Sequence, residues 1–139
     1  MAGEQATYKV LSTSSGVTNI VSNRVFGGGQ APEDEVFPYV TYEVIGIADR
    51  TPSIAGSTGL VAKRIQVNCV TTSYTQTTNL ADRVTVALHA FSGAAGAETV
   101  RGIFVEDELD VTVPLVKGGD KYAYIKVLPC VVWVDEAKT

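Results

Sequence analysis

Alternation of apolar and polar residues with a period of two recurs along the sequence and constrains the fold more than any other feature. The clearest example is the segment KRIQVNCV, in which Ile65, Val67 and Cys69 share one parity while polar residues hold the other. The same alternation begins at Tyr39 and returns in the segment TVRGIFVEDELDVTV. Because successive side chains of a strand point to opposite faces, these segments predict strands with one apolar face.

The segment TVRGIFVEDELDVTV predicts either one long strand or two strands joined by an acidic turn. The residues expected to face the core are Ile103, Val105, Leu109, Val111 and Val113. Glu106, Glu108 and Asp110 have the opposite parity, so we expect them to share one exposed face. A last strand is expected from Tyr122 to about Val134, and Pro129 within it favours an edge position or a bulge.

One segment carries the signature of a capped, amphipathic helix. Ser73 stands three residues before Gln76, which is the spacing of a capping box. The apolar stripe that should pack on a sheet consists of Leu80, Val84, Ala87, Leu88 and Phe91. A shorter helix is expected over Glu4–Ser12, followed by a turn of helix near Val17–Val21.

The order helix, strand, strand, helix, strand, strand predicts an α+β domain. We expect a mainly antiparallel sheet of four to five strands, with a long helix packed on one face and a short N-terminal helix. The chain has 139 residues, of which 45% are hydrophobic, so residues 1–139 fit a single domain. The segment RTPSIAGSTGLVA carries a proline and glycines, and it predicts a long loop between two strands.

Charge and hydropathy exclude several classes of partner. The net charge is −4 and no basic run is longer than Lys63–Arg64, which disfavours a general nucleic-acid surface. No apolar run approaches the roughly 20 residues of a membrane helix, and the N-terminus lacks the pattern of a secretion signal. We therefore expect a cytoplasmic chain whose two cysteines, Cys69 and Cys130, are buried free thiols.

Three consecutive glycines, Gly27 to Gly29, raise the question of a phosphate-binding loop. The spacing fits neither the dinucleotide-binding fingerprint nor the P-loop, and no Lys followed by Ser or Thr comes after them. The carboxylates of Glu33, Asp34 and Glu35 follow closely and would repel a phosphate. We interpret the glycines as a hinge or connector ahead of the strand that begins at Tyr39.

Candidate catalytic groups are few. His89 lies opposite the apolar stripe of its helix, so it is expected to face solvent without an orienting partner. The acidic residues gather at Glu33–Glu35 and Glu106–Asp110, without the apolar pocket that paired carboxylates need or the oxygen pattern of a calcium loop. Solvated or interface charge is favoured over a divalent-cation site or catalysis. We expect no enzyme activity, no cofactor and no metal site.

Three segments together resemble a known family: NRVFGGGQAPEDEVFPYVTYEVIG, IAGSTGLVAKRIQVNCVTTSYTQTTNLADRVTVAL and YIKVLPCVVWV. Their order and spacing are similar to those of the tail-completion, or tail-to-head joining, proteins of long-tailed phages, from about Tyr8 to Val134. The resemblance includes a helix with the rhythm Leu80, Ala81, Val84, Ala87, Leu88. The glycine run and the acidic EDELD segment depart from the family pattern.

The resemblance implies a structural virion protein of the neck or tail. Members form a ring, usually a hexamer, that caps the tail tube and meets the head-closure complex, while genomic DNA passes through the lumen. The implied partners are further copies of the chain, the tail-tube protein and the head-closure protein, with assembly in the host cytoplasm. A head-closure protein, a tail-tube subunit and, less favoured, a small enzyme remain alternatives.

Two surfaces are candidates for contacts in such a ring. The long loop offers Ile54, Gly56, Gly59 and Leu60 for contact with a neighbouring copy or the tube. The acidic face of Glu106, Glu108 and Asp110 could line the lumen, where like charge keeps DNA from adhering, or contact basic residues of a neighbour, or form plain outer surface. The sequence leaves these three possibilities open.

Overall fold

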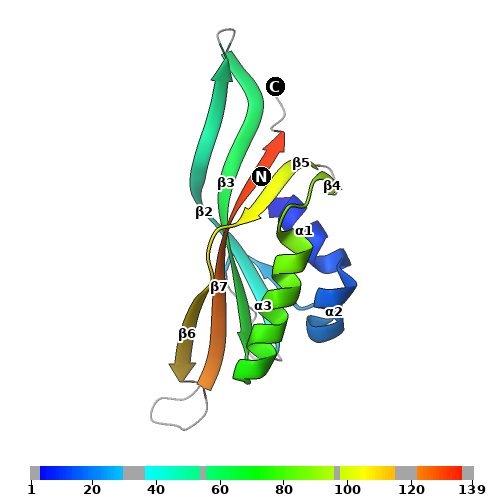
Figure 1. Ribbon diagram of the computed structural model, residues 1–139, viewed down its shortest axis with the longest axis vertical. Helices are drawn as coiled ribbons and strands as arrows, with labels where there is room; N and C mark the ends of the chain where they lie inside the picture. Colours follow the sequence, from blue (N-terminus) through cyan, green and yellow to red (C-terminus); the bar gives the residue numbers. More distant parts are fainter. Residues whose placement is uncertain (1–3, 30–36, 54–55, 96–97, 115–121, 136–139) are drawn as a thin grey trace.

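The computed structural model describes residues 4–29, 37–53, 56–95, 98–114 and 122–135, and only the backbone course of residues 47–53, 56–60, 98, 114 and 135. Three helices and seven strands lie within these residues, and together they make a strongly twisted sheet with helices on one side (Figure 1). In chain order they are α1 (Glu4–Thr13), α2 (Ser15–Val21), β1 (Val25–Gly27), β2 (Tyr39–Ser53), β3 (Gly56–Thr71), α3 (Tyr74–Leu88), β4 (Gly93–Ala95), β5 (Glu98–Val105), β6 (Leu109–Pro114) and β7 (Tyr122–Asp135).

The described strands form one mixed sheet in the order β1-β2-β3-β7-β5-β4, and β6 also pairs with β7. β1 runs parallel to β2, and every other pair among the described strands is antiparallel. β5 and β6 lie one after the other along the same edge of β7, β5 against residues 130–134 and β6 against residues 122–127. The segment predicted as one strand or two is therefore two strands.

The predicted fold class is wrong in its proportions. Seven strands replace the four to five expected, one pair is parallel, and strands hold more of the described residues than helices do. β1 and β4 have three residues each, which is too short for a period-two pattern to be recognised in the sequence. α3 has 15 residues and shares the helical layer with α1 and α2, so no single long helix covers the sheet.

The segment expected as a long loop is instead a β-hairpin, which projects beyond the helices in Figure 1. Pro52 pairs with Ser57 and Ser53 with Gly56, so the strands continue almost to the turn. Three register shifts in β2 interrupt the ladder, and such irregularities allow a proline to sit in a strand. Gly56, Gly59 and Leu60 belong to β3, whereas Ile54 lies outside the described residues.

α3 begins where the sequence predicts. Ser73 has extended backbone angles and its side chain accepts a hydrogen bond from the Gln76 N–H at 3.5 Å. Leu80, Val84 and Leu88 are buried in the core, and Ala87 and Phe91 pack partly against it. The helix ends at Leu88, so Phe91 reaches the core from the connector rather than from the helix.

The first two helices are close to their predicted bounds. α1 ends at Thr13, one residue beyond the prediction, and α2 begins at Ser15, two residues before the helical turn predicted near Val17. Val10 and Leu11 of α1 and Val17 and Val21 of α2 are buried. These short helices complete the layer that covers one face of the sheet.

The hydrophobic core lies between the helices and one face of the sheet. In β3, Ile65, Val67 and Cys69 are fully buried, as the alternation predicts, and Arg64 on the opposite face is exposed. The opposite face of the described sheet carries no helix (Figure 1). We call this uncovered side the bare face of the sheet.

Candidate functional site

A one-residue bulge between β5 and β6 reverses the direction in which the side chains of β6 point. Val105 is opposite Cys130 and Leu109 is opposite Val127, so three intervening residues of this edge face only two of β7. Since successive side chains alternate between faces, one extra residue moves every following side chain to the other face. Val105 therefore points to the helix-covered face and Leu109 to the bare face.

The expectation that β6 turns its apolar residues to the core is consequently wrong. Leu109, Val111 and Val113 are 48%, 43% and 42% exposed, whereas Ile103 of β5 is fully buried. The sequence shows one continuous parity from Ile103 to Val113 because it does not reveal the extra residue in the connector. Both strands do alternate, but the phase of the alternation changes at the bulge.

Pro129 provides a physical reason for the bulge. Its carbonyl oxygen accepts a hydrogen bond from the Glu106 N–H at 2.8 Å, so the backbone carbonyl of Pro129 faces the β5–β6 connector. A residue in an antiparallel ladder donates and accepts on the same side, and proline has no N–H to donate. The ladder breaks where the donor is missing. Pro129 thus lies in an inner strand at a bulge rather than in an edge strand.

The reversal creates an apolar surface on the bare face, which we call the β6 band. It consists of Leu109, Val111 and Val113, and the partly buried Ile125 and Val127 of β7 lie opposite Val111 and Leu109 on the same face. Among the described strands only β7 pairs with β6, so the other edge of β6 is free. Antiparallel sheets normally turn polar residues to an uncovered face, and exposed apolar edge strands favour association.

The acidic residues of this region meet basic partners within the same chain. Glu106 forms an ion pair with Arg64 at 3.3 Å, and Lys126 contacts Asp110 at 2.7 Å and Glu108 at 3.9 Å. Only Asp110 lies in β6; the two glutamates belong to the connector. The bulge therefore breaks up the single acidic face that the sequence predicts.

Lys126 is the residue around which part of this cluster is organised. Its side chain is only 9% exposed, and its ammonium lies 5.3 Å from the centre of the Tyr74 ring. The hydrogen bond to Asp110 raises the pKa of Lys126, and the same hydrogen bond lowers the pKa of Asp110. A lysine in an apolar strand pattern gives no sign in the sequence of which carboxylates will neutralise it, so this group was missed.

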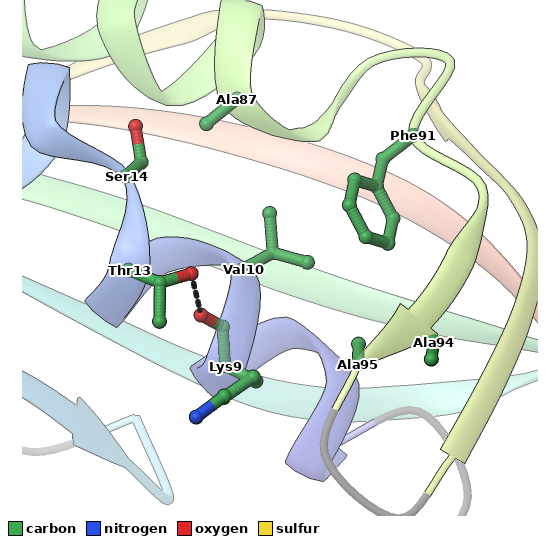
Figure 2. A pocket seen from close by; sticks show the side chains of 8 residues that line it. All are labelled: Lys9, Val10, Thr13, Ser14, Ala87, Phe91, Ala94 and Ala95. Carbon is green, nitrogen blue, oxygen red and sulfur yellow. Dashed lines mark hydrogen bonds between the residues drawn. The ribbon is translucent and has the colours of Figure 1, made fainter.

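A pocket of about 350 Å³ lies between α1, the C-terminal end of α3 and β4 (Figure 2). Its lining residues come from α1, the link to α2, the end of α3, the α3–β4 connector and β4: Lys9, Val10, Thr13, Ser14, Ala87, Phe91, Ala94 and Ala95. Thr13 donates a hydrogen bond to the Lys9 carbonyl at 2.6 Å, which leaves a mainly apolar interior with Lys9 at its rim. No pattern in the sequence indicates this pocket, because its walls meet only in the folded chain.

Arg83 of α3 adds a second cation near the pocket. A Cβ atom at Gly16 would lie 3.7 Å from Arg83 Nη1 and 3.8 Å from the hydroxyl of Ser14, which lines the pocket. Within the described part of the chain, no carboxylate forms an ion pair with Lys9 or Arg83. The pocket is therefore apolar inside with a basic surrounding.

The triple glycine ends a short strand. Gly27 closes β1, and Gly28 and Gly29 have φ values of 78° and 74°, which glycine adopts readily. The Gly29 N–H donates to the Tyr42 carbonyl at 3.0 Å, and a Cβ atom there would lie 2.6 Å from a carboxylate oxygen of Glu43. This N–H is engaged and stands beside a negative charge, which is the opposite of what a phosphate-binding loop needs.

His89 is exposed, as expected, but it does have an orienting partner. Its Nδ1 accepts a hydrogen bond from the Val105 N–H at 3.1 Å, and its ring stands edge-on to Phe104. The expectation was wrong because the partner comes from β5, which lies outside the helical wheel. His89 thus links the end of α3 to the last residue of β5.

Cys69 and Cys130 are buried free thiols. Cys130 is opposite Ile65, four residues from Cys69 along β3, and four residues of strand span roughly 13 Å, beyond the reach of a disulfide. Burial raises the pKa of both thiols, that of Cys130 to about 12. Raised pKa values make both thiols poor nucleophiles.

Neither a metal-binding cluster nor a membrane-spanning helix is found among the described residues. They contain no group of three or more His, Cys, Asp or Glu side chains placed to hold a metal ion. No helix among them is long and apolar enough to cross a membrane.

Comparisons with known proteins show a family and a similar fold. The family described as Tail completion protein gp17 matches residues 5–117. Among solved structures, a chain of the "Virion of native gene transfer agent (GTA) particle" superposes with a TM-score of 0.67 at 16% identity, covering 94% of both chains. No curated protein matches. The sequence resemblance is confirmed: this chain belongs to the gp17 family of tail completion proteins and is a structural protein of the phage tail.

Proposed function

We propose that copies of this chain assemble into a ring, with six as the expected number, that closes the end of the tail tube. In the proposed particle the ring meets the tail-tube protein on one side and the head-closure protein on the other, and genomic DNA passes through its lumen. The chain would be assembled in the host cytoplasm and reside in the neck of the virion.

The observation that carries this proposal is the β6 band. Three apolar side chains, each more than 40% exposed, lie on a helix-free face beside a free strand edge. A lone soluble subunit gains nothing from such a surface, and large exposed apolar patches mark protein contacts. Family membership supplies the kind of assembly in which the surface would be covered.

The projecting β2–β3 hairpin supports the same role. It extends beyond the helical layer (Figure 1), and its end includes Gly56, Gly59 and Leu60. An arm of this shape can lie across a neighbouring subunit or the tube end. The contact role of these residues, and that of Ile54, stays a prediction.

The acidic residues are proposed to serve mainly as a brace, that is, to stabilise the fold through ion pairs within the chain. Arg64 and Lys126 neutralise part of the charge of Glu106, Glu108 and Asp110, so these three carboxylates are less suited to repel DNA from a lumen than unpaired ones would be. The charge that is left is available to line a lumen or to contact a neighbour.

Analytical ultracentrifugation and negative-stain imaging of the purified chain test the proposal. Closed rings of uniform diameter are expected as the final state. A tail-tube subunit would instead polymerise into tubes of increasing length. A chain that forms only tubes, or that stays monomeric at its highest soluble concentration, would contradict the ring.

A further inference from the structure

Two surfaces at different places on this chain complement each other. The β6 band is an exposed apolar surface on the bare face of the sheet, whereas the pocket lies on the helical side. In Figure 1, β6 lies at the lower left and the helix–β4 region at the upper right, so the two surfaces do not overlap. One molecule can therefore use both at once.

We propose that the β6 band of one copy binds the pocket between α1, α3 and β4 of the next copy. This inference rests on the proposed ring and names the two surfaces that make it. A contact between two different surfaces of the same chain is heterologous, and such contacts generate rings when the rotation between copies closes. A contact of the band with itself would stop at a dimer.

The sizes of the two surfaces agree. A cavity of about 150 Å³ is enough to bind benzene, so the pocket of about 350 Å³ has room for more than one aliphatic side chain. Val111 lies at the centre of the band, with Leu109 and Val113 two residues away on the same face. Val10, Ala87 and Phe91 give the pocket an apolar lining that matches them (Figure 2).

The charges beside the two surfaces are opposite. Lys9 and Arg83 lie at and near the pocket and form no ion pair with a described carboxylate. Glu106, Asp107 and Glu108 lie directly before the band and are exposed. Arg64 and Lys126 neutralise part of the charge of the two glutamates, so Asp107, which forms no ion pair with a described cation, is the main carboxylate left for a neighbour. Opposite charges around an apolar contact fix its orientation and speed its formation. This charge pattern favours a second copy of the chain as the occupant of the pocket.

The test uses two full-length variants, each with one surface blocked. Val111→Arg places a cation in the band, and Ala94→Trp places a bulky ring at an exposed residue of β4 that lines the pocket. Lys9→Glu serves as a second pocket variant in case the tryptophan disturbs folding. Val86→Arg is the control, because Val86 is apolar and 82% exposed on α3 but belongs to neither surface. Circular dichroism and thermal melting verify that every variant is folded.

Sedimentation velocity measures the assembly state of each variant, and the expected results are as follows. The wild-type chain and Val86→Arg form the ring, whereas Val111→Arg and Ala94→Trp each stay monomeric. An equimolar mixture of the two blocked variants forms dimers and nothing larger, because one intact band and one intact pocket remain per pair. Association of the wild-type chain weakens by roughly tenfold or more when salt rises from 0.05 to 0.5 M, since the flanking charges are then screened.

Other outcomes would overturn the inference in distinguishable ways. If the folded pocket variants assemble like the wild type while Val111→Arg does not, the band binds another surface. If the mixture of blocked variants stays monomeric, or if both variants form rings alone, the pairing of these surfaces is wrong although the ring stands. If the wild-type chain itself never assembles, the proposed function and this inference fail together.

Discussion

Replacing Leu88 by alanine tests how the helical layer is anchored to the sheet. Leu88 is the last residue of α3 and is only 1% exposed, within the core cluster that also includes Leu80 and Val84. The substitution removes three carbon atoms from this environment. At about 0.8 kcal/mol for each buried methylene, the transfer contribution is about 2.4 kcal/mol.

The cavity left behind adds to this cost, because well-packed surroundings relax only in part. Leu→Ala substitutions at buried sites typically lower the free energy of unfolding by about 2 to 5 kcal/mol. We expect a value near 3 kcal/mol for Leu88→Ala, since the end of a helix next to a pocket can relax more than its middle. For a chain of this length that corresponds to a fall in melting temperature of roughly 10 °C.

Thermal and denaturant unfolding monitored by circular dichroism measure the change. The matched control is Val86→Ala, two residues away on the same helix, where the side chain is 82% exposed and the expected change is within about 0.5 kcal/mol. If Leu88→Ala and Val86→Ala have the same unfolding midpoint, α3 does not pack on the sheet through the face described above.

Three further predictions concern the thiols and the acidic cluster. Thiol titration should find two free thiols, Cys69 and Cys130, after denaturation without a reductant and almost none in the native chain; no reactive thiol after denaturation would mean that they are oxidised. The pKa of Asp110 is lowered in the folded chain, so its stabilising contribution is present above the unfolded pKa and is lost as the pH falls through the folded pKa. The pKa of Lys126 is raised in the folded chain, so its stabilising contribution is present below the unfolded pKa and is lost as the pH rises through the folded pKa. Asp110→Asn should therefore flatten the acid limb of a plot of melting temperature against pH, and an unchanged limb would exclude the ion pair as its cause. The last prediction concerns the replacement of Glu106, Glu108 and Asp110 together by amides. If these residues act as a brace, rings should stay intact while the melting temperature falls; if they line the lumen, DNA retention should change; and if they contact a neighbour, ring formation should decrease. A variant that is normal in all three assays would leave solvated surface as their role.

Local signals in the sequence were sufficient for elements that depend on neighbouring residues. Ser73 and Gln76 predict the start of α3 because a cap is formed within one turn. The alternation of Ile65, Val67 and Cys69 predicts both β3 and its buried face, since burial on one face imposes a period of two.

Features that depend on distant partners could not be predicted in this way. The phase of β6 is set by Pro129, which lies about twenty residues further along the chain and faces the connector only after β7 has paired. β1 and β4 are strands because of their neighbours, β2 and β5, rather than through their own three residues.

The candidate surfaces follow the same division. Glu106, Glu108 and Asp110 were recognised as a charged group, but their partners Arg64 and Lys126 lie on β3 and β7. The apolar β6 band was mistaken for core, because an exposed apolar strand and a buried one have the same pattern. Only the fold tells which face the helices cover.

Incubation of the purified chain with tail tubes assembled from the tube protein alone, followed by negative-stain imaging, tests the proposed role most directly. We predict a closed ring at one end of each tube and an arrest of further tube growth. Tubes that keep growing with bare ends, or that incorporate the chain along their length, would contradict a protein that completes the tail.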